Sequence, residues 1–125
     1  MNSAIFAVLA LSAFGVNAAD LPCSIHPKEG ASPADLQALA KVTKPMAERV
    51  ALGVVRVASA VVESSELEAE NGCLIYTFDI KVPRKKSVVE VAIDAGTGQV
   101  LSRKIEGPKA QAAEAAADRA GGRER

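Results

Sequence analysis

The chain has 125 residues, of which 49% are hydrophobic and only 3% are aromatic. Lys and Arg number 15 together, as do Asp and Glu, so the formal net charge is zero. No strong field therefore draws the chain toward nucleic acid or anionic lipid, and its length allows one small domain.

Residues 1–19 contain no charged side chain and carry an apolar run from Ala4 to Val16, followed by small residues. This layout is typical of a secretory signal peptide. Gly15 and Asn17 interrupt the run, which is shorter than the ~20 apolar residues of a membrane-spanning helix. A retained anchor is the alternative. We predict a cleaved signal peptide, a periplasmic or secreted protein, and no stable membrane insertion after cleavage.

Two cysteines, Cys23 and Cys73, follow this segment. A disulfide is the most frequent fate of a cysteine pair in an exported protein, so we predict this bridge. It would tie an irregular segment, residues 20–31, to the start of a strand, and contribute about 3–4 kcal/mol. The alternatives are two free thiols, or a metal site that also uses His26. Because His26 is the only histidine, ligands for zinc are few, and we predict a solvated His26, no metal and no cofactor.

Two helices are predicted next. Ser32 has the character of an N-cap, with Pro33 at the first helical position and Asp35 three residues after the cap. This helix should stop at residues 41–44, because the residue before Pro45 is pushed out of the α region. A second helix from Pro45 has one apolar arc and needs a surface to lie on. The arc contains Met46, Ala47, Val50, Ala51, Val54, Val57 and Ala58, with Leu52 as an apolar exception outside it.

From Val61 the apolar period changes from 3.6 to 2, which indicates strands. In the first strand, Val61, Ser65, Leu67 and Ala69 are expected to share one face. Asn71-Gly72 is favoured in two-residue type I′ turns, because both positions need positive φ. Apolar residues then alternate from Leu74 to Val82 and from Val89 to Ala95, and Val100-Leu101 can start a fourth strand.

The predicted fold class is α+β, with an N-terminal helical part packed on one face of a three- to four-stranded antiparallel meander. The domain is expected to span residues 32–105. Residues 106–125 are rich in Ala and charge and contain no large apolar residue. We predict a solvated, disordered tail there, although its composition favours transient helix.

Four sequence motifs occur in a characteristic order between residues 42 and 101. They are Glu48-Arg49-Val50-Ala51-Leu52 in a helix, Glu66-Leu67-Glu68-Ala69-Glu70 in a charged strand, Cys73-Leu74-Ile75-Tyr76, and Asp94-Ala95-Gly96-Thr97-Gly98-Gln99-Val100 closing an apolar strand. In this order they resemble the PepSY domain.

The resemblance implies a small extracytoplasmic domain that binds or restrains other proteins, in some members a protease, and that is not generally an enzyme. Two features depart from the family pattern. Residues 83–87 replace a Gly-containing turn, and the cysteine pair is not expected of the family in general.

The Asp94–Gly98 run could suggest an aspartic-protease loop, but the spacing is wrong and no second motif supplies the paired carboxylate. We interpret it as a strand-ending turn in which Asp94 and Thr97 accept from local backbone donors and the glycines, Gly96 and Gly98, take positive φ. No nucleophile lies beside a base in the sequence pattern, so we predict no enzymatic activity.

Two surface groups are candidates for contact with a partner. One is the row of Glu66, Glu68 and Glu70, expected to face solvent beside Lys81 and to pair across strands for ~0.2–1 kcal/mol. The other is a basic hairpin tip, which a solvated turn that blocks edge pairing would also explain. The tip contains Arg84, Lys85 and Lys86.

The function predicted from these features is a non-enzymatic, exported protein-binding module. Its expected partner is another exported protein, and the resemblance adds peptidases to the candidates. The alternative is a small ligand- or metal-binding carrier that uses Cys23, His26 and Cys73.

Overall fold

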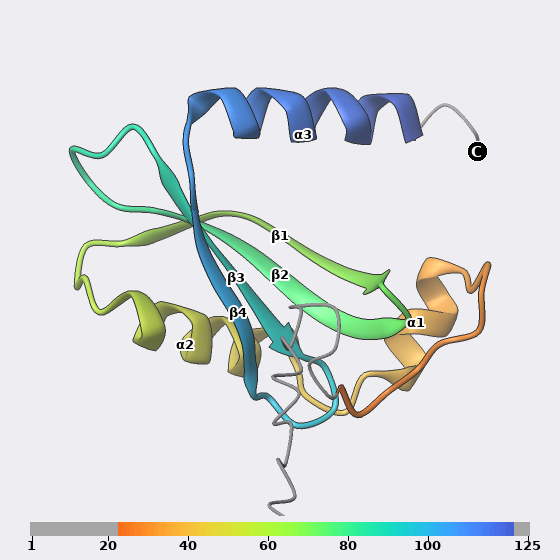
Figure 1. Cartoon of the computed structure of the whole chain (residues 1–125). Helices are drawn as coiled ribbons and strands as arrows, with labels where there is room; N and C mark the ends of the chain where they lie inside the picture. Colours follow the sequence, from red (N-terminus) through yellow and green to blue (C-terminus); the bar gives the residue numbers. More distant parts are fainter. Residues whose placement is uncertain (1–22, 122–125) are drawn as a thin grey trace, which may run out of the picture.

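The computed structural model describes residues 23–121, so the predicted signal peptide lies outside the described residues. The four strands form one antiparallel sheet in the order β1-β2-β3-β4, a simple meander (Figure 1). The predicted α+β class is confirmed. The elements are α1 (Pro33–Leu39), α2 (Lys44–Val55), β1 (Val61–Glu70), β2 (Cys73–Lys81), β3 (Val88–Asp94), β4 (Val100–Glu106) and α3 (Pro108–Gly121).

The helix α1 begins at the predicted capping box. Asp35 N donates to Ser32 Oγ at 3.2 Å, and Ser32 N donates to Asp35 Oδ2 at 3.1 Å. These two bonds satisfy donors that the first turn would otherwise leave open. Helix α2 begins at Lys44, one residue before the predicted Pro45, because Thr43 caps it. Within residues 23–121, no helix is long and apolar enough to cross a membrane.

The apolar face of α2 differs from the predicted arc. The residues that α2 buries completely or nearly so are Ala47, Ala51 and Val55, four residues apart. Met46 and Val50 were predicted on the buried arc, but they are 52% and 38% exposed. Small alanine side chains let the helix axis approach the sheet closely, so the contact line follows the alanines.

The β1–β2 connection is the predicted two-residue turn. Glu70 pairs with Cys73, which leaves only Asn71 and Gly72 in the loop. Their φ angles are 50° and 78°, the left-handed values that a type I′ turn needs at both positions.

A β-bulge interrupts β1 between Val62 and Ser64. The extra residue reverses the alternation of side chains before it, so Val62 pairs with Ile80 and packs against the core. Val61 is consequently 63% exposed. The prediction that Val61 shares the apolar face with Leu67 is therefore wrong, because strict alternation allows no inserted residue.

The main core lies between α1, α2 and one face of the sheet. Phe78, Leu74 and Ile80 of β2 are fully buried there. Tyr76 lies in the same row, and its hydroxyl donates to Val42 O at 2.8 Å, which satisfies the polar end of a buried ring.

The face of the sheet opposite the main core was expected to be charged and to face solvent, but much of it is buried. By strand alternation Ile75, Val88 and Ala92 belong to this face, and all three are buried. Glu90, on the same face, is only 9% exposed. Figure 1 shows α3 lying across this side of the sheet, opposite α2.

The predicted disordered tail is wrong for Pro108–Gly121, which form α3. Its alanine-rich composition has high helix propensity, so the helix needs little burial to form. The first turn is also held by a side chain: Gln111 Nε2 donates to Glu106 O at 3.1 Å and to Lys86 O at 3.4 Å.

Candidate functional site

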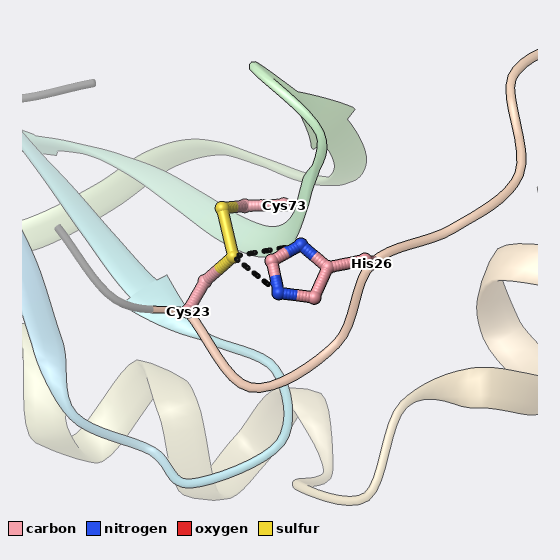
Figure 2. Close-up of side chains that lie close together, drawn as sticks. All are labelled: Cys23, His26 and Cys73. Carbon is pink, nitrogen blue, oxygen red and sulfur yellow. Dashed lines mark hydrogen bonds between the residues drawn. A yellow bond between two sulfur atoms is a disulfide. The ribbon is translucent and has the colours of Figure 1, made fainter. Parts of the chain in front are cut away.

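The predicted disulfide between Cys23 and Cys73 is present, with an S–S distance of 1.98 Å and a Cα–Cα distance of 5.8 Å (Figure 2). Cys73 is the first residue of β2, and Cys23 is the first described residue of the chain. Both side chains are half-buried. The bridge therefore closes a long loop at one end of the sheet, within reach of solvent.

The segment that carries Cys23 is also held without the disulfide. Leu74 N donates to Ile25 O at 3.0 Å, as an added strand residue would. Ser24 donates twice to the Asp94 carboxylate, from its backbone N at 2.8 Å and from Oγ at 2.6 Å. The N-terminal segment is thus hydrogen-bonded to β2 through Ile25 and to β3 through Ser24, although both strands lie far from it in the sequence.

Asp94 is the centre of this end of the sheet and is 1% exposed. As predicted for a turn, it accepts from Gly96 N at 2.7 Å and from Thr97 N at 3.1 Å. Burial alone raises the pKa of Asp94, but the hydrogen bonds from Ser24, Gly96 and Thr97 outweigh it and hold the pKa below its usual value. The bond to Ser24 was not predicted, because turn signals describe only neighbours in sequence.

Two glycines make this turn possible. Gly98 has a φ of 78°, as predicted, but Gly96 has no positive φ, so the prediction is wrong for Gly96. A Cβ atom at Gly96 would collide with the Ser24 hydroxyl, so Gly96 is required by the close approach of the N-terminal segment.

His26 stands at the rim of the disulfide and is exposed, as a solvated residue would be. It nevertheless makes defined contacts. Its Nδ1 lies 3.0 Å from Gly72 O, and the edge of its ring faces Cys23 Sγ, with Nδ1 at 3.6 Å and Nε2 at 4.0 Å (Figure 2). The possible donor atoms of Cys23, His26 and Cys73 all lie within 4.8 Å of one another. While the disulfide is intact, neither sulfur is a thiolate that could hold a metal.

The second candidate surface is the acidic row, defined as Glu66, Glu68 and Glu70 on the edge strand β1. Its members alternate along the strand and share the face opposite α2. Across the strands, they pair with Thr77, Ile75 and Cys73.

Lys81 does not neutralise the acidic row. It pairs with Val61 at the far end of β1, so the predicted cross-strand ion pairing is wrong. Lys104 forms ion pairs with Glu90 and Glu106, and the acidic row forms none with the side chains that the structure describes. Burial raises the pKa of Glu68, and the charges of Glu70 and Glu66 raise it further, while a hydrogen bond from Thr77 Oγ1 at 3.2 Å offsets a part.

Beside the acidic row, a cleft of about 400 Å³ lies between β1, β2 and α3. Glu63, Glu66 and Asp79 line it from the sheet, and Ala112 and Ala115 line it from α3. The sheet side therefore supplies carboxylates and hydroxyl groups, and the helix supplies two alanine side chains and the amide of Gln111.

Sequence reasoning missed a second group of carboxylates, Asp79, Glu90 and Glu106, whose oxygens lie within 4.8 Å of one another. They come from three neighbouring strands, and Lys104 Nζ contacts Glu90 at 3.2 Å and Glu106 at 3.5 Å. Burial raises the pKa of Glu90, and Lys104 offsets only a part of this. Alternation within each strand places these residues on the charged face, but only the register of β2, β3 and β4 brings them together.

The basic tip, Arg84-Lys85-Lys86, is exposed in the connection between β2 and β3. Arg84 takes a φ of 67°, and Lys85 N donates to Val82 O at 3.1 Å, so the tip is a hydrogen-bonded turn. It lies at the end of β2 opposite to Glu70. The two predicted contact groups therefore do not form one surface.

Comparison with known proteins yields no match: no family model, no curated protein and no solved structure is similar enough to this chain. The resemblance to the PepSY domain stays a prediction. The function is accordingly proposed from the side chains themselves.

Proposed function

We propose that the protein is a non-enzymatic, exported binding module whose acidic row docks a basic segment of another exported protein. The observation that carries this proposal is the crowding of Glu66, Glu68 and Glu70 on one edge strand with no Lys or Arg at ion-pair distance among residues 23–121. Like charges this close destabilise the sheet. Burial raises the pKa of Glu68 most, and the charges of Glu70 and Glu66 raise it further.

A cationic partner would relieve this cost. Lys or Arg side chains set against the row would form charge-assisted hydrogen bonds, and the neighbouring cleft offers room for a side chain. Complementary charge of this kind chiefly sets specificity and association rate. The PepSY resemblance supports a peptidase or another envelope protein as the partner. A purely protective role, in which the charges keep the edge strand from pairing with other chains, is the rival explanation.

Capture from an extract of exported proteins, with crosslinking, distinguishes the two roles. The wild-type chain is compared with Glu66→Gln/Glu70→Gln and with a matched control, Glu29→Gln/Glu48→Gln, which changes the net charge equally on other surfaces. We expect a discrete partner with the wild type and the control, and at least ten-fold less with the row variant. Capture should also fall as salt is raised, because exposed charges are screened.

Equal capture by the row variant and the wild type would refute the proposal. The peptidase version is tested by titrating the wild-type protein into assays of the captured partner. Unchanged peptidase activity would leave the binding role and remove the inhibitory one.

A further inference from the structure

We propose that reduction of the Cys23–Cys73 disulfide turns this end of the sheet into a binding site for one thiophilic metal ion of the Zn²⁺ class, held by both sulfurs and by His26. Thiolate and imidazole are the ligands that such ions prefer, and two cysteines with one histidine leave a fourth position open. This inference goes beyond the proposed binding role, since none of the three residues belongs to the acidic row.

The distances suit a tetrahedral ion. With a metal–sulfur distance of about 2.3 Å and a metal–nitrogen distance of about 2.0–2.1 Å, the sulfur and nitrogen ligands stand about 3.6 Å apart. Nε2 of His26 lies 4.0 Å from Cys23 Sγ before any adjustment. The two sulfurs, once unbonded, need a separation of about 3.7 Å, which rotation about the Cα–Cβ bonds can provide.

The backbone selects the tautomer of His26 that can bind a metal. Gly72 O lies 3.0 Å from Nδ1, and a carbonyl oxygen can only accept a hydrogen bond, so Nδ1 carries the proton. Nε2 is then the nitrogen with a free lone pair. A hydrogen bond from the remote ring nitrogen to a backbone carbonyl is the usual support of a metal-binding histidine.

Hydrogen bonds hold this site in addition to the sulfur–sulfur bond. Ile25 O accepts from Leu74 N, and Ser24 donates to the Asp94 carboxylate from its backbone N and from Oγ. Cys73 follows a rigid two-residue turn. His26 is exposed and both cysteines are half-buried, so a reductant and an ion can reach them.

A dithiol reductant reduces the disulfide by supplying two electrons and becoming a cyclic disulfide. Its thiolate attacks Cys73 Sγ, and Cys23 leaves as a thiolate beside His26. The second thiol of the reductant then attacks the mixed disulfide and releases Cys73. Binding of the ion displaces any proton on the two sulfurs.

Titration with Co²⁺ and Zn²⁺ tests the proposal on the full chain, reduced with an excess of a phosphine and compared with the oxidised form. We expect the reduced protein to bind one Co²⁺ or Zn²⁺ ion per chain and not to bind Mg²⁺. The Co²⁺ form should show sulfur-to-cobalt charge-transfer absorption. The oxidised protein should bind none. His26→Ala keeps both cysteines and should weaken Zn²⁺ binding at least ten-fold.

Glu106→Gln is the matched control, because it alters the cluster of Asp79, Glu90 and Glu106 and leaves the three proposed ligands intact. It should bind Zn²⁺ as the wild type does. If reduction unfolds the chain, one equivalent of Zn²⁺ should restore the circular dichroism of the oxidised protein. Three results would overturn the proposal: no binding after reduction, equal binding by His26→Ala, or loss of binding in Glu106→Gln. None of them bears on capture by the acidic row.

Discussion

Asp94 and Glu90 lie on the same strand, four residues apart, and both carboxylates are buried, yet their surroundings act on them in opposite directions. Asp94 accepts hydrogen bonds from Ser24, Gly96 and Thr97, and its pKa is lowered. Glu90 has a single lysine beside it, and its pKa is raised.

The same difference separates two regions of the molecule: the disulfide end of the sheet, around Asp94, and the face under α3, around Glu90. At the disulfide end of the sheet, a negative charge holds the fold together because four hydrogen bonds from three residues are directed at the Asp94 carboxylate. On the face under α3, negative charges accumulate at a cost to stability, and Glu106 Oε2 is buried without a hydrogen-bond partner in the described structure. Charge in the first region is structural. In the second region, Lys104 pairs with Glu90 and Glu106, but no Lys or Arg of residues 23–121 lies at ion-pair distance from the acidic row.

Removal of the disulfide should have the largest effect on stability. Cys23→Ala/Cys73→Ala opens a loop whose ends are 50 residues apart, and we expect the free energy of unfolding to fall by about 4 kcal/mol. Denaturant unfolding of the oxidised wild type and the variant measures the difference. A loss below about 1 kcal/mol would mean that the hydrogen bonds of residues 24 and 25 alone hold this end.

Asp94→Ala should come second, with a loss of about 3 kcal/mol, because it removes charge-assisted bonds and leaves several donors without an acceptor. Thr97→Ala is the control. Thr97 is exposed and its hydroxyl accepts only from Gln99 N, so we expect a loss below about 1 kcal/mol. Equal losses in the two variants would show that the Asp94 carboxylate is not the centre of this region.

The pH dependence of stability should separate the regions further. The folded pKa of Asp94 is lowered, so its contribution is complete above the unfolded value and is lost as the pH falls below about 4. Thermal unfolding across pH 2–5 should show this loss in the wild type and a flatter profile in Asp94→Asn. Parallel profiles would contradict the assignment.

Glu68→Gln should have the smallest effect and the opposite sign. The folded pKa of Glu68 is raised, so its ionised form lowers stability at neutral pH and protonation restores stability as the pH falls toward about 4.5. Because Glu68 is half-exposed and solvent screens its charge, we expect Glu68→Gln to gain less than about 1 kcal/mol at pH 7. Glu29→Gln, on an exposed loop, should gain nothing. Destabilisation by Glu68→Gln would refute the view that the acidic row is kept at a cost.

The residues show why prediction succeeded locally and failed over longer distances. The capping box at Ser32 and the turn at Asn71-Gly72 depend on side chains within three positions, and both are present. The buried arc of α2 and the bulge in β1 depend on how closely a helix approaches the sheet and where a strand absorbs an extra residue. Neither has a signal in the periodicity itself.

The sequence by itself determined α1, α2, the strands, the α+β class and the only possible intrachain cysteine pair, because these follow from periodicity, turn chemistry and the presence of two cysteines. It did not determine α3. The tertiary structure alone decided three contacts. Asp94 accepts hydrogen bonds from Ser24, the His26 ring contacts the Gly72 carbonyl beside the disulfide, and carboxylates of three strands meet under α3. These contacts join residues up to 70 positions apart, and only the register of the sheet and the closure of the chain bring them within hydrogen-bonding distance.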